Sequence, residues 1–324
     1  SMSQKWSLVA DIGGTNARFS ALLEGQLESQ YEFHYSVEEY PEFGGLILIL
    51  LQEIKSATGW GNPPSSACFA VACPADSEII SFTNSHWIFS TSELQALVGC
   101  KTLLIINDFE AVAHGITELS EVDLVQVGGE APVANKAIGI MGAGTGLGVA
   151  CLVPHPKGYH VLDTEGGHAD YSPIDDMQSA VVNTLRARFG RVSLERLLSG
   201  KGLLNIYTAL CSIENDDVDF KTPAEVVAAA LGNTDTKALQ TLNMFCEGVG
   251  AAAGNLALTF GAKGGIYIAG GVIPRFQEFF IKSGFRKKFE DKGRFVSYLQ
   301  PIPVYLVTRS NLGLLGAAKK IQQF

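Results

Sequence analysis

The sequence predicts an α/β fold with two domains, and three observations support this prediction. Short apolar runs typical of β-strands alternate with longer stretches whose apolar residues follow the spacing of a helix. The chain has 324 residues, whereas single hydrophobic cores stop growing at roughly 250–300 residues. A glycine-threonine turn between two apolar runs also occurs twice, with the copies 130 positions apart.

The first third of the chain contains alternating strand and helix patterns. Strand-like runs lie at residues 6–12, 17–24, 66–72, 78–84 and 102–108. Helical spacing is found at residues 41–59, 90–99 and 109–119. The longest unbroken apolar run, residues 46–51, is far shorter than the ~18–20 residues that span a bilayer. We interpret it as the buried stripe of the first helix.

The remainder of the chain begins with the second strand-turn-strand pattern, at residues 136–154. Residues 170–260 are expected to be mainly helical, with clear helical runs at 177–190 and 238–261. We then expect a buried strand within residues 264–272, a charged helix-rich segment, a short strand at 303–308 and a terminal helix at 311–324. No Pro-rich linker separates the domains.

Composition and charge exclude several classes of protein. A formal net charge of −9 argues against nucleic-acid binding, which needs a basic surface, whereas backbone N–H groups can still hold a small anion. The start of the chain lacks the apolar core of a signal peptide. The six scattered cysteines form no CxxC pair, which is typical of reduced, mostly buried thiols. We therefore expect a cytoplasmic protein with no nucleic-acid or membrane partner.

The two glycine turns resemble each other beyond the turn itself. Shifted by 130 positions, Gly14 and Thr15 coincide with Gly144 and Thr145, and the apolar positions that follow also match. This echo indicates a duplicated fold with a ligand held between its halves, the alternative being chance similarity of two glycine-rich hairpins. A third glycine pair, Gly270-Gly271, ends a buried strand. Glycine turns let backbone amides approach phosphate oxygens.

Two common nucleotide-binding motifs are absent. No segment supplies the GxxxxGK[ST] pattern of the P-loop. The GxGxxG fingerprint of dinucleotide-binding folds fails at residues 142–148, because Leu147 stands where the third glycine belongs. That loop also joins two strands, not a strand and a helix. A nicotinamide dehydrogenase is therefore a weak interpretation.

Asp11 stands at the end of the first strand, directly before the first glycine turn. A carboxylate beside phosphate groups is repelled unless a cation intervenes. Mg²⁺ usually keeps several waters and is held by one or two carboxylates together with phosphates. We therefore expect Asp11 to hold Mg²⁺ through water. The alternative is an aspartate that caps the turn amides.

Seven segments occur in the order known from one family: ADIGGTNAR, FTNSHW, IINDFEAVA, GAGTGLGVA, EGGHADY, RLLSGKGL and YIAGGVIPRFQEFF. The chain thereby resembles bacterial ATP-dependent glucokinases of the actin-like (sugar kinase/Hsp70/actin) superfamily over nearly its whole length. The resemblance implies two actin-like (ribonuclease H-like) domains that flank an interdomain cleft. The small domain would comprise residues 1–107 plus 309–324 and the large one residues 108–308. The family is typically homodimeric.

The resemblance also carries functional residues onto this chain. Asp108 matches the catalytic base. The sugar-binding positions fall on Asn84, Asn107, Asp108, Glu165, His168 and Glu195. The ATP-binding positions fall on Ala10, Asp11, Ile12, Gly13, Gly14, Thr15, Gly144, Thr145, Gly270 and Gly271. One departure is visible, because Thr164 occupies the first position of the usual GEGGH segment.

The residues themselves support part of this assignment. Asp108 follows an apolar strand and precedes a helical pattern, and α/β sheets hold ligands at the carboxyl ends of their strands. In phosphoryl transfer a carboxylate orients the attacking hydroxyl and accepts its proton. The alternative for Asp108 is a helix N-cap. For Glu165 and His168 one alternative is a metal site completed by Asp170, and for His168 another is a plain structural histidine.

We therefore expect a kinase that converts ATP and D-glucose to ADP and glucose 6-phosphate with Mg²⁺, the first step of glycolysis. One alternative is another hexose kinase of the same fold, acting on mannose, fructose or an N-acetylhexosamine. A second is a sugar sensor without catalytic activity, which the intact Asp108 disfavours. Residues 165–178 contain no cysteine, which argues against the ROK branch of the superfamily with its cysteine-rich zinc motif.

Overall fold

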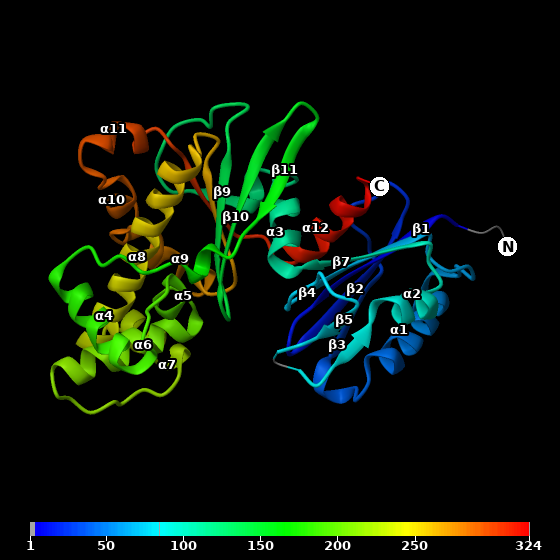
Figure 1. Ribbon diagram of the computed structural model, residues 1–324, viewed down its shortest axis with the longest axis horizontal. Coiled ribbons are helices and arrows are strands. Elements are labelled where there is room, and N and C mark those ends of the chain that lie inside the picture. Colours follow the sequence, from blue (N-terminus) through cyan, green and yellow to red (C-terminus); the bar gives the residue numbers. More distant parts are fainter. Residues whose placement is uncertain (1–3, 84, 324) are drawn as a thin grey trace. The chain divides into compact units, whose positions relative to one another are not determined.

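The computed structural model describes residues 4–83 and 85–323, and the chain divides into two compact units (Figure 1). The first unit comprises Ser1–Leu119 and Arg309–Phe324, and the second comprises Ser120–Thr308. The boundary expected at residues 107/108 differs from this division. The reason is helix α3 (Asp108–Ile116), which packs against the C-terminal helix α12 (Leu312–Ile321) of the first unit.

The first unit is built on a five-stranded sheet with the order β3-β2-β1-β4-β7. Its strands are β3 (Glu32–Ser36), β2 (Asn16–Leu23), β1 (Trp6–Ile12), β4 (Ser66–Val71) and β7 (Thr102–Asn107). Strand β1 forms an antiparallel hairpin with β2, whereas β1, β4 and β7 run parallel. The carboxyl ends of these three strands therefore lie at one edge of the sheet, and this edge carries Asp11 and Asp108.

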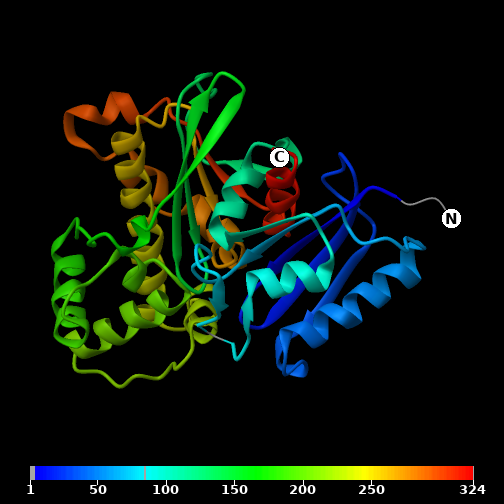
Figure 2. The same ribbon diagram turned by 45° about the vertical axis from the view of Figure 1, so that its right-hand side comes forward.

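Helices cover both faces of this sheet. Side chains of β1 alternate between the faces, as the pleat of a strand requires. Leu8, Ala10 and Ile12 pack with α1 (Phe43–Thr58) and α2 (Thr91–Val98). Val9 packs on the opposite face with α3 and α12, which lie side by side in both views (Figures 1 and 2). A separate two-stranded ribbon consists of β5 (Ile79–Ser81) and β6 (Ile88–Ser90).

The second unit repeats this sheet with one added strand, in the order β11-β10-β9-β12-β13-β8. Its strands are β11 (Gly158–Asp163), β10 (Leu147–His155), β9 (Ile138–Ala143), β12 (Ile266–Ala269), β13 (Val304–Val307) and β8 (Leu124–Gln126). The first five have the same order and relative directions as in the first unit. The predicted duplication is confirmed at the level of topology. The last ladder pair of the first hairpin, Ile12 and Ala17, encloses one residue more than the corresponding pair of the second, Ala143 and Leu147.

The second unit is otherwise helical, as residues 170–260 predict. Its helices are α4 (Asp176–Phe189), α5 (Leu194–Leu197), α6 (Gly200–Ile213), α7 (Pro223–Leu231), α8 (Thr236–Phe260), α9 (Gln277–Lys282), α10 (Phe285–Glu290) and α11 (Val296–Leu299). Helix α8 runs through the core of this unit. Gly250 lets α8 approach α10 closely, because a Cβ there would overlap the Phe285 carbonyl.

The sequence missed the edge strands β3, β8 and β11. An edge strand pairs on one side only and exposes more of its side chains, so its apolar alternation is weak. All six cysteines are free and buried, as expected. Within the described ranges, no helix has both the length and the apolar character needed to cross a membrane.

Candidate active site

Asp108 is the first residue of α3 and directly follows β7. The helix cap is Asn107, whose Oδ1 accepts the Phe109 N–H at 3.0 Å, so the alternative that Asp108 is the N-cap is wrong. The side-chain amide of Asn107 also donates to the Cys73 carbonyl at 3.4 Å. The amide oxygen of Asn107 keeps a second lone pair, and its nitrogen keeps a second proton, so both can still bond a sugar hydroxyl. The first turn of a helix favours a carboxylate such as Asp108.

Asp11 lies near the end of β1 on the sheet face covered by α12. A Cβ on Gly313 of α12 would lie 2.6 Å from the Asp11 carboxylate, so the helix is packed directly against it. Arg18 is the ladder partner of Asp11 across the hairpin and donates to Asn311 Oδ1 at 2.5 Å. Asn311 precedes α12 in a left-handed conformation.

The pKa of the Asp11 carboxyl is raised to about 6; burial is the largest cause, the nearby charge of Asp108 adds to it, and Arg18 opposes both. The structure thus brings the predicted metal residue and the predicted base together at one edge of the sheet. Two carboxylates held close together form a site that a hard divalent cation suits. The residues present therefore fit Mg²⁺.

The first glycine turn follows Asp11. The Gly13 N–H donates to the Asn16 carbonyl at 2.9 Å and closes the loop. Ala10 and Ile12 also belong to the predicted ATP-binding residues. Both are completely buried in the core, so they support the turn from the side of the core. Gly13, Gly14 and Thr15 are at least partly accessible. The predicted sugar residue Asn84 lies outside the described residues.

Three predicted sugar-binding residues come together in the second unit. His168 Nε2 lies 4.0 Å from Glu165 Oε2, and His168 Nδ1 lies 4.0 Å from Glu195 Oε2. Their side chains are accessible, with exposed fractions of 87% for Glu165, 55% for His168 and 32% for Glu195. Two carboxylates and an imidazole offer acceptors and a donor for adjacent hydroxyl groups.

The loop that carries Glu165 and His168 is held in place by backbone contacts. The Thr164 hydroxyl donates to the Val149 carbonyl at 2.7 Å and accepts the Gly166 N–H at 3.1 Å. Gly167 lies against the Leu147 carbonyl and leaves no room for a side chain. Threonine at position 164 therefore adds two hydrogen bonds to the loop.

Asp170 does not join His168 and Glu165. Its carboxylate pairs with Arg191 at 2.6 Å, and the same guanidinium group donates to the His168 carbonyl at 2.8 Å. Among the described residues, no three His, Cys, Asp or Glu side chains are grouped to hold a metal ion. Asp170 is therefore engaged by Arg191 and does not complete a metal site with Glu165 and His168.

Glu195 links the predicted sugar-binding residues to the second glycine turn. Its Oε1 accepts the Leu147 N–H at 2.9 Å, and Gly146 lies so close to this carboxylate that a Cβ would overlap it. The Gly144 carbonyl accepts the N–H of Gly200 at 2.8 Å, at the start of α6. The turn is thus fixed from two sides.

The third glycine pair packs against the second turn. Gly270 has a φ of +93° and lies against the Ala143 carbonyl, where only glycine fits. The Val272 N–H donates to the same carbonyl at 3.2 Å. Nothing lies within 4 Å of the Cβ positions of Gly144 and Gly271. The Gly144 N–H is used inside the turn, where it donates to the Gly146 carbonyl at 2.9 Å, whereas Gly271 is exposed.

The matches to known proteins agree with this geometry. A family profile described as Glucokinase matches residues 8–324. A curated glucokinase of Tolumonas auensis is 45% identical over 318 residues, which cover 98% of this chain and 97% of the relative. The chain belongs to the glucokinase family. It is accordingly a glucose kinase that uses ATP, and the resemblance seen in the sequence is confirmed.

Solved structures confirm the two-domain actin-like fold. A glucokinase from an Antarctic psychrotroph is 33% identical, has a TM-score of 0.87 and covers 99% of both chains. A ROK family glucokinase from Streptomyces griseus, in complex with glucose and AMPPNP, is 17% identical, with a TM-score of 0.63 over 98% of this chain and 100% of that one. The latter likeness concerns the fold alone.

Sequence reasoning missed the residues that position the site. Arg18 and Gly313 flank Asp11, and Arg191 anchors the backbone of His168. Arg18 lies within the first glycine segment and could have been noticed there. No local sequence pattern marks Gly313 or Arg191 as a site residue. The partner of Gly313, Asp11, is distant in the chain, and the contact of Arg191 with His168 follows no spacing rule.

Proposed function

We propose that Asp108 is the general base of glucose phosphorylation and that Asp11 helps to hold Mg²⁺ beside it. The observation that carries this proposal is the common location of the two carboxylates, close enough for the charge of Asp108 to raise the pKa of Asp11. The proposal is also supported by the position of Asp108 at the end of β7 and the start of α3.

In the proposed reaction the 6-hydroxyl oxygen of glucose forms a bond to the γ-phosphorus of ATP while the bond to the leaving ADP oxygen breaks. Asp108 accepts the hydroxyl proton. The backbone N–H groups of Thr145 and Gly271, two exposed residues of the glycine turns, orient the phosphates. Mg²⁺, when bound, would neutralise the charge on the phosphate oxygens.

We further propose that glucose is bound by Asn107, Glu165, His168 and Glu195. The last three are grouped, because a carboxylate oxygen of Glu165 and one of Glu195 each lie 4.0 Å from a ring nitrogen of His168. Adjacent equatorial hydroxyls of a hexose are suited to such a set of alternating acceptors and donors. We expect glucose to be preferred over mannose, fructose and N-acetylglucosamine.

We assign the chain to the non-ROK branch because residues 165–178 contain no cysteine for the zinc motif of the ROK branch. The homodimeric state stays a prediction from the resemblance, and the cytoplasmic location stays a prediction from the composition of the chain. Light scattering coupled to size-exclusion chromatography tests the first, with about twice the chain mass of 34.6 kDa expected.

The decisive experiment is a coupled assay for glucose 6-phosphate with the wild type, Asp108→Asn and the control Glu121→Gln on an exposed turn. We expect Asp108→Asn to lower kcat by about 10²–10⁴-fold, with glucose affinity by calorimetry within about tenfold of wild type. Near-normal turnover of this variant would place the base elsewhere. Glucose binding without turnover in the wild type would favour the sensor.

A further inference from the structure

Helices α3 and α12 of the first unit touch through their backbones. A Cβ on Gly316 of α12 would overlap the Ala111 carbonyl of α3. A Cβ on Gly115 of α3 would lie 3.0 Å from the Leu312 carbonyl oxygen of α12, a milder overlap. Both contacts involve main-chain atoms, which cannot rotate away as the end of a side chain can. Any side chain at position 316 therefore forces the two helices apart.

The same pair of helices carries or contacts both aspartates of the proposed site. Asp108 is the first residue of α3, one turn before Ala111. Gly313 lies one turn before Gly316 on α12 and is packed against the carboxylate of Asp11. A movement of α3 would displace Asp108, and a movement of α12 would change its contact with Asp11. The separation of the two carboxylates therefore depends on the close approach at Gly316.

Charged side chains hold the two helices together at the first turn of α3. Glu110 Oε2 lies 3.5 Å from Lys320 Nζ of α12 and accepts a hydrogen bond from His114 Nε2 at 3.0 Å. The exposed fractions are 20% for the Glu110 side chain, 23% for Lys320 and 5% for His114. Partly buried pairs are screened by salt much less than exposed ones. Glu110 thus connects the start of α3 to the end of α12.

We propose that Gly316 and Glu110 are positioning residues for phosphoryl transfer. They hold α3 against α12 and thereby fix Asp108 relative to Asp11. Gly316 is buried in the helix pair, so it acts through the helices. This positioning role rests on the functions proposed above for the two aspartates. Displacement of a reacting group by about 1 Å can lower a rate about 10²-fold, so a small separation of the helices is enough to impair the reaction.

The first test is the substitution Gly316→Ala. We expect kcat per folded molecule to fall about 10–10²-fold, with the folded fraction measured by circular dichroism. The Mg²⁺ concentration for half-maximal activity should rise. Glucose affinity by calorimetry should stay within about tenfold of wild type, because three of the four proposed sugar residues belong to the second unit. Gly115→Ala meets the milder overlap and should lose less kcat.

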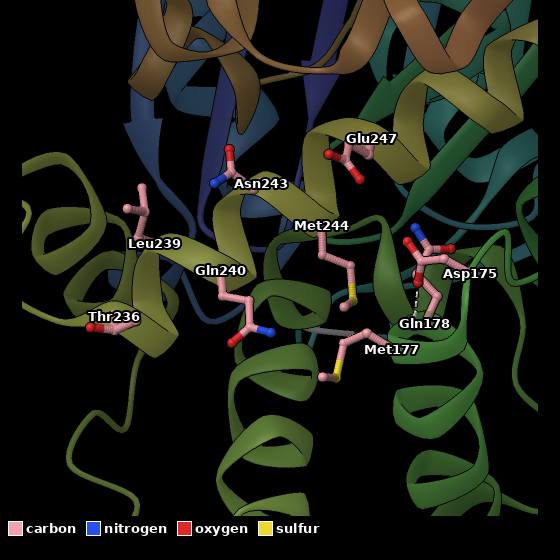
Figure 3. A pocket seen from close by; sticks show the side chains of 9 residues that line it. All are labelled: Asp175, Met177, Gln178, Thr236, Leu239, Gln240, Asn243, Met244 and Glu247. Atoms are coloured by element: carbon pink, nitrogen blue, oxygen red, sulfur yellow. Dashed lines mark hydrogen bonds between the residues drawn. The ribbon is translucent and has the colours of Figure 1, made fainter. Parts of the chain in front are cut away.

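Gly254→Ala in α8 is the matched control. A Cβ there would lie 2.5 Å from the Phe289 carbonyl oxygen of α10, so this helix pair is also forced apart. Helix α8 carries none of the residues assigned above to glucose, ATP or Mg²⁺, and none of them lines the hollow of about 360 Å³ along its first half (Figure 3). We expect both glycine variants to have a lower Tm than wild type, with kcat per folded molecule unchanged in Gly254→Ala alone.

The second test breaks the ion pair from each side. Glu110→Gln removes a negative charge two residues from Asp108, and Lys320→Met removes the positive charge that faces it. A direct electrostatic effect on Asp108 would have opposite signs in the two variants. Loss of the contact between the helices should instead lower kcat in both, by about threefold. Glu118→Gln, which removes the 2.6 Å pair with Lys319 beyond the end of α3, is the control and should keep kcat.

Normal kcat of folded Gly316→Ala would overturn the positioning role, and so would opposite effects of Glu110→Gln and Lys320→Met. If Gly316→Ala does not fold, the two ion-pair variants decide. Near-normal turnover of Asp108→Asn would overturn the functions proposed for the aspartates, and the positioning role with them. Loss of turnover in Asp108→Asn together with normal kcat of Gly316→Ala would overturn the positioning role alone.

Discussion

Gly313 of α12 lies directly against the carboxylate of Asp11, so that a methyl group on Gly313 would come within 2.6 Å of Asp11 Oδ2. These two residues are about as far apart in the sequence as the chain permits, yet they share the edge of the sheet that carries Asp108. The C-terminal helix is therefore part of the structure that positions the candidate metal residue.

The substitution Gly313→Ala should damage this arrangement. Because both the helix and β1 are packed in the core, we expect a loss of about 1–3 kcal/mol in the free energy of unfolding. The Mg²⁺ concentration for half-maximal activity should also rise, since Asp11 must move. Urea denaturation and an Mg²⁺ titration measure the two effects.

Gly45→Ala is the control for that substitution. Gly45 is exposed on α1 with nothing within 4 Å of its Cβ position, so alanine should stabilise the helix by about 0.5–1 kcal/mol. Equal stabilities of Gly313→Ala and wild type would show that α12 does not hold Asp11.

The pKa of Asp11 predicts an unusual pH dependence. Because it is raised from 3.8 to about 6 in the folded state, the folded chain binds more protons than the unfolded chain between these pH values. Stability therefore falls as pH rises through this window, by about 3 kcal/mol in total. The cost persists above pH 6 in the absence of Mg²⁺.

The substitution Asp11→Asn removes the free-energy cost of a buried, ionised carboxylate at this position. We expect the variant to be more stable than wild type by up to about 3 kcal/mol at pH 7.5 without Mg²⁺, and equally stable near pH 4. The same variant should need more Mg²⁺ for activity. A stability difference between Asp11→Asn and wild type that does not change with pH would contradict the prediction. An unchanged Mg²⁺ requirement would mean that Asp11 caps the amides of the turn instead.

Glu195 is expected both to bind glucose and to hold the second glycine turn through the Leu147 N–H. Two substitutions separate these roles. Glu195→Gln keeps an acceptor for the Leu147 N–H and should raise the KM for glucose about tenfold with little change in the KM for ATP. Glu195→Ala leaves that N–H without its partner, so the KM for ATP should rise as well. If the two variants behave alike, the hydrogen bond does not shape the glycine turn.

Thr164 should stabilise the loop of Glu165 and His168. Thr164→Val keeps the shape but removes the hydroxyl that bridges Val149 and Gly166, at a cost of about 1–3 kcal/mol. We expect a raised KM for glucose with a smaller change in kcat, from steady-state kinetics. Thr164→Ser retains the hydroxyl and should resemble wild type; equal effects of the two would refute the role.

Much of the fold could be predicted because its signals are local. Apolar periodicity indicated the central strands and the long helices, and the repeated glycine turn indicated the duplication. The edge strands were missed, since they lack a two-sided apolar pattern. The end of the first unit was placed before α3, because only the packing of α3 on α12 shows that this helix belongs to it.

The sequence by itself determined the α/β class, the glycine turns and the polar residues that define the family, since strand period, turn chemistry and motif order are all properties of neighbouring residues. Only the tertiary structure decided that Gly313 meets Asp11, that Asn107 caps α3 and that Glu195 bonds to Leu147. Such contacts depend on how side chains pack in three dimensions, and no local pattern encodes that packing.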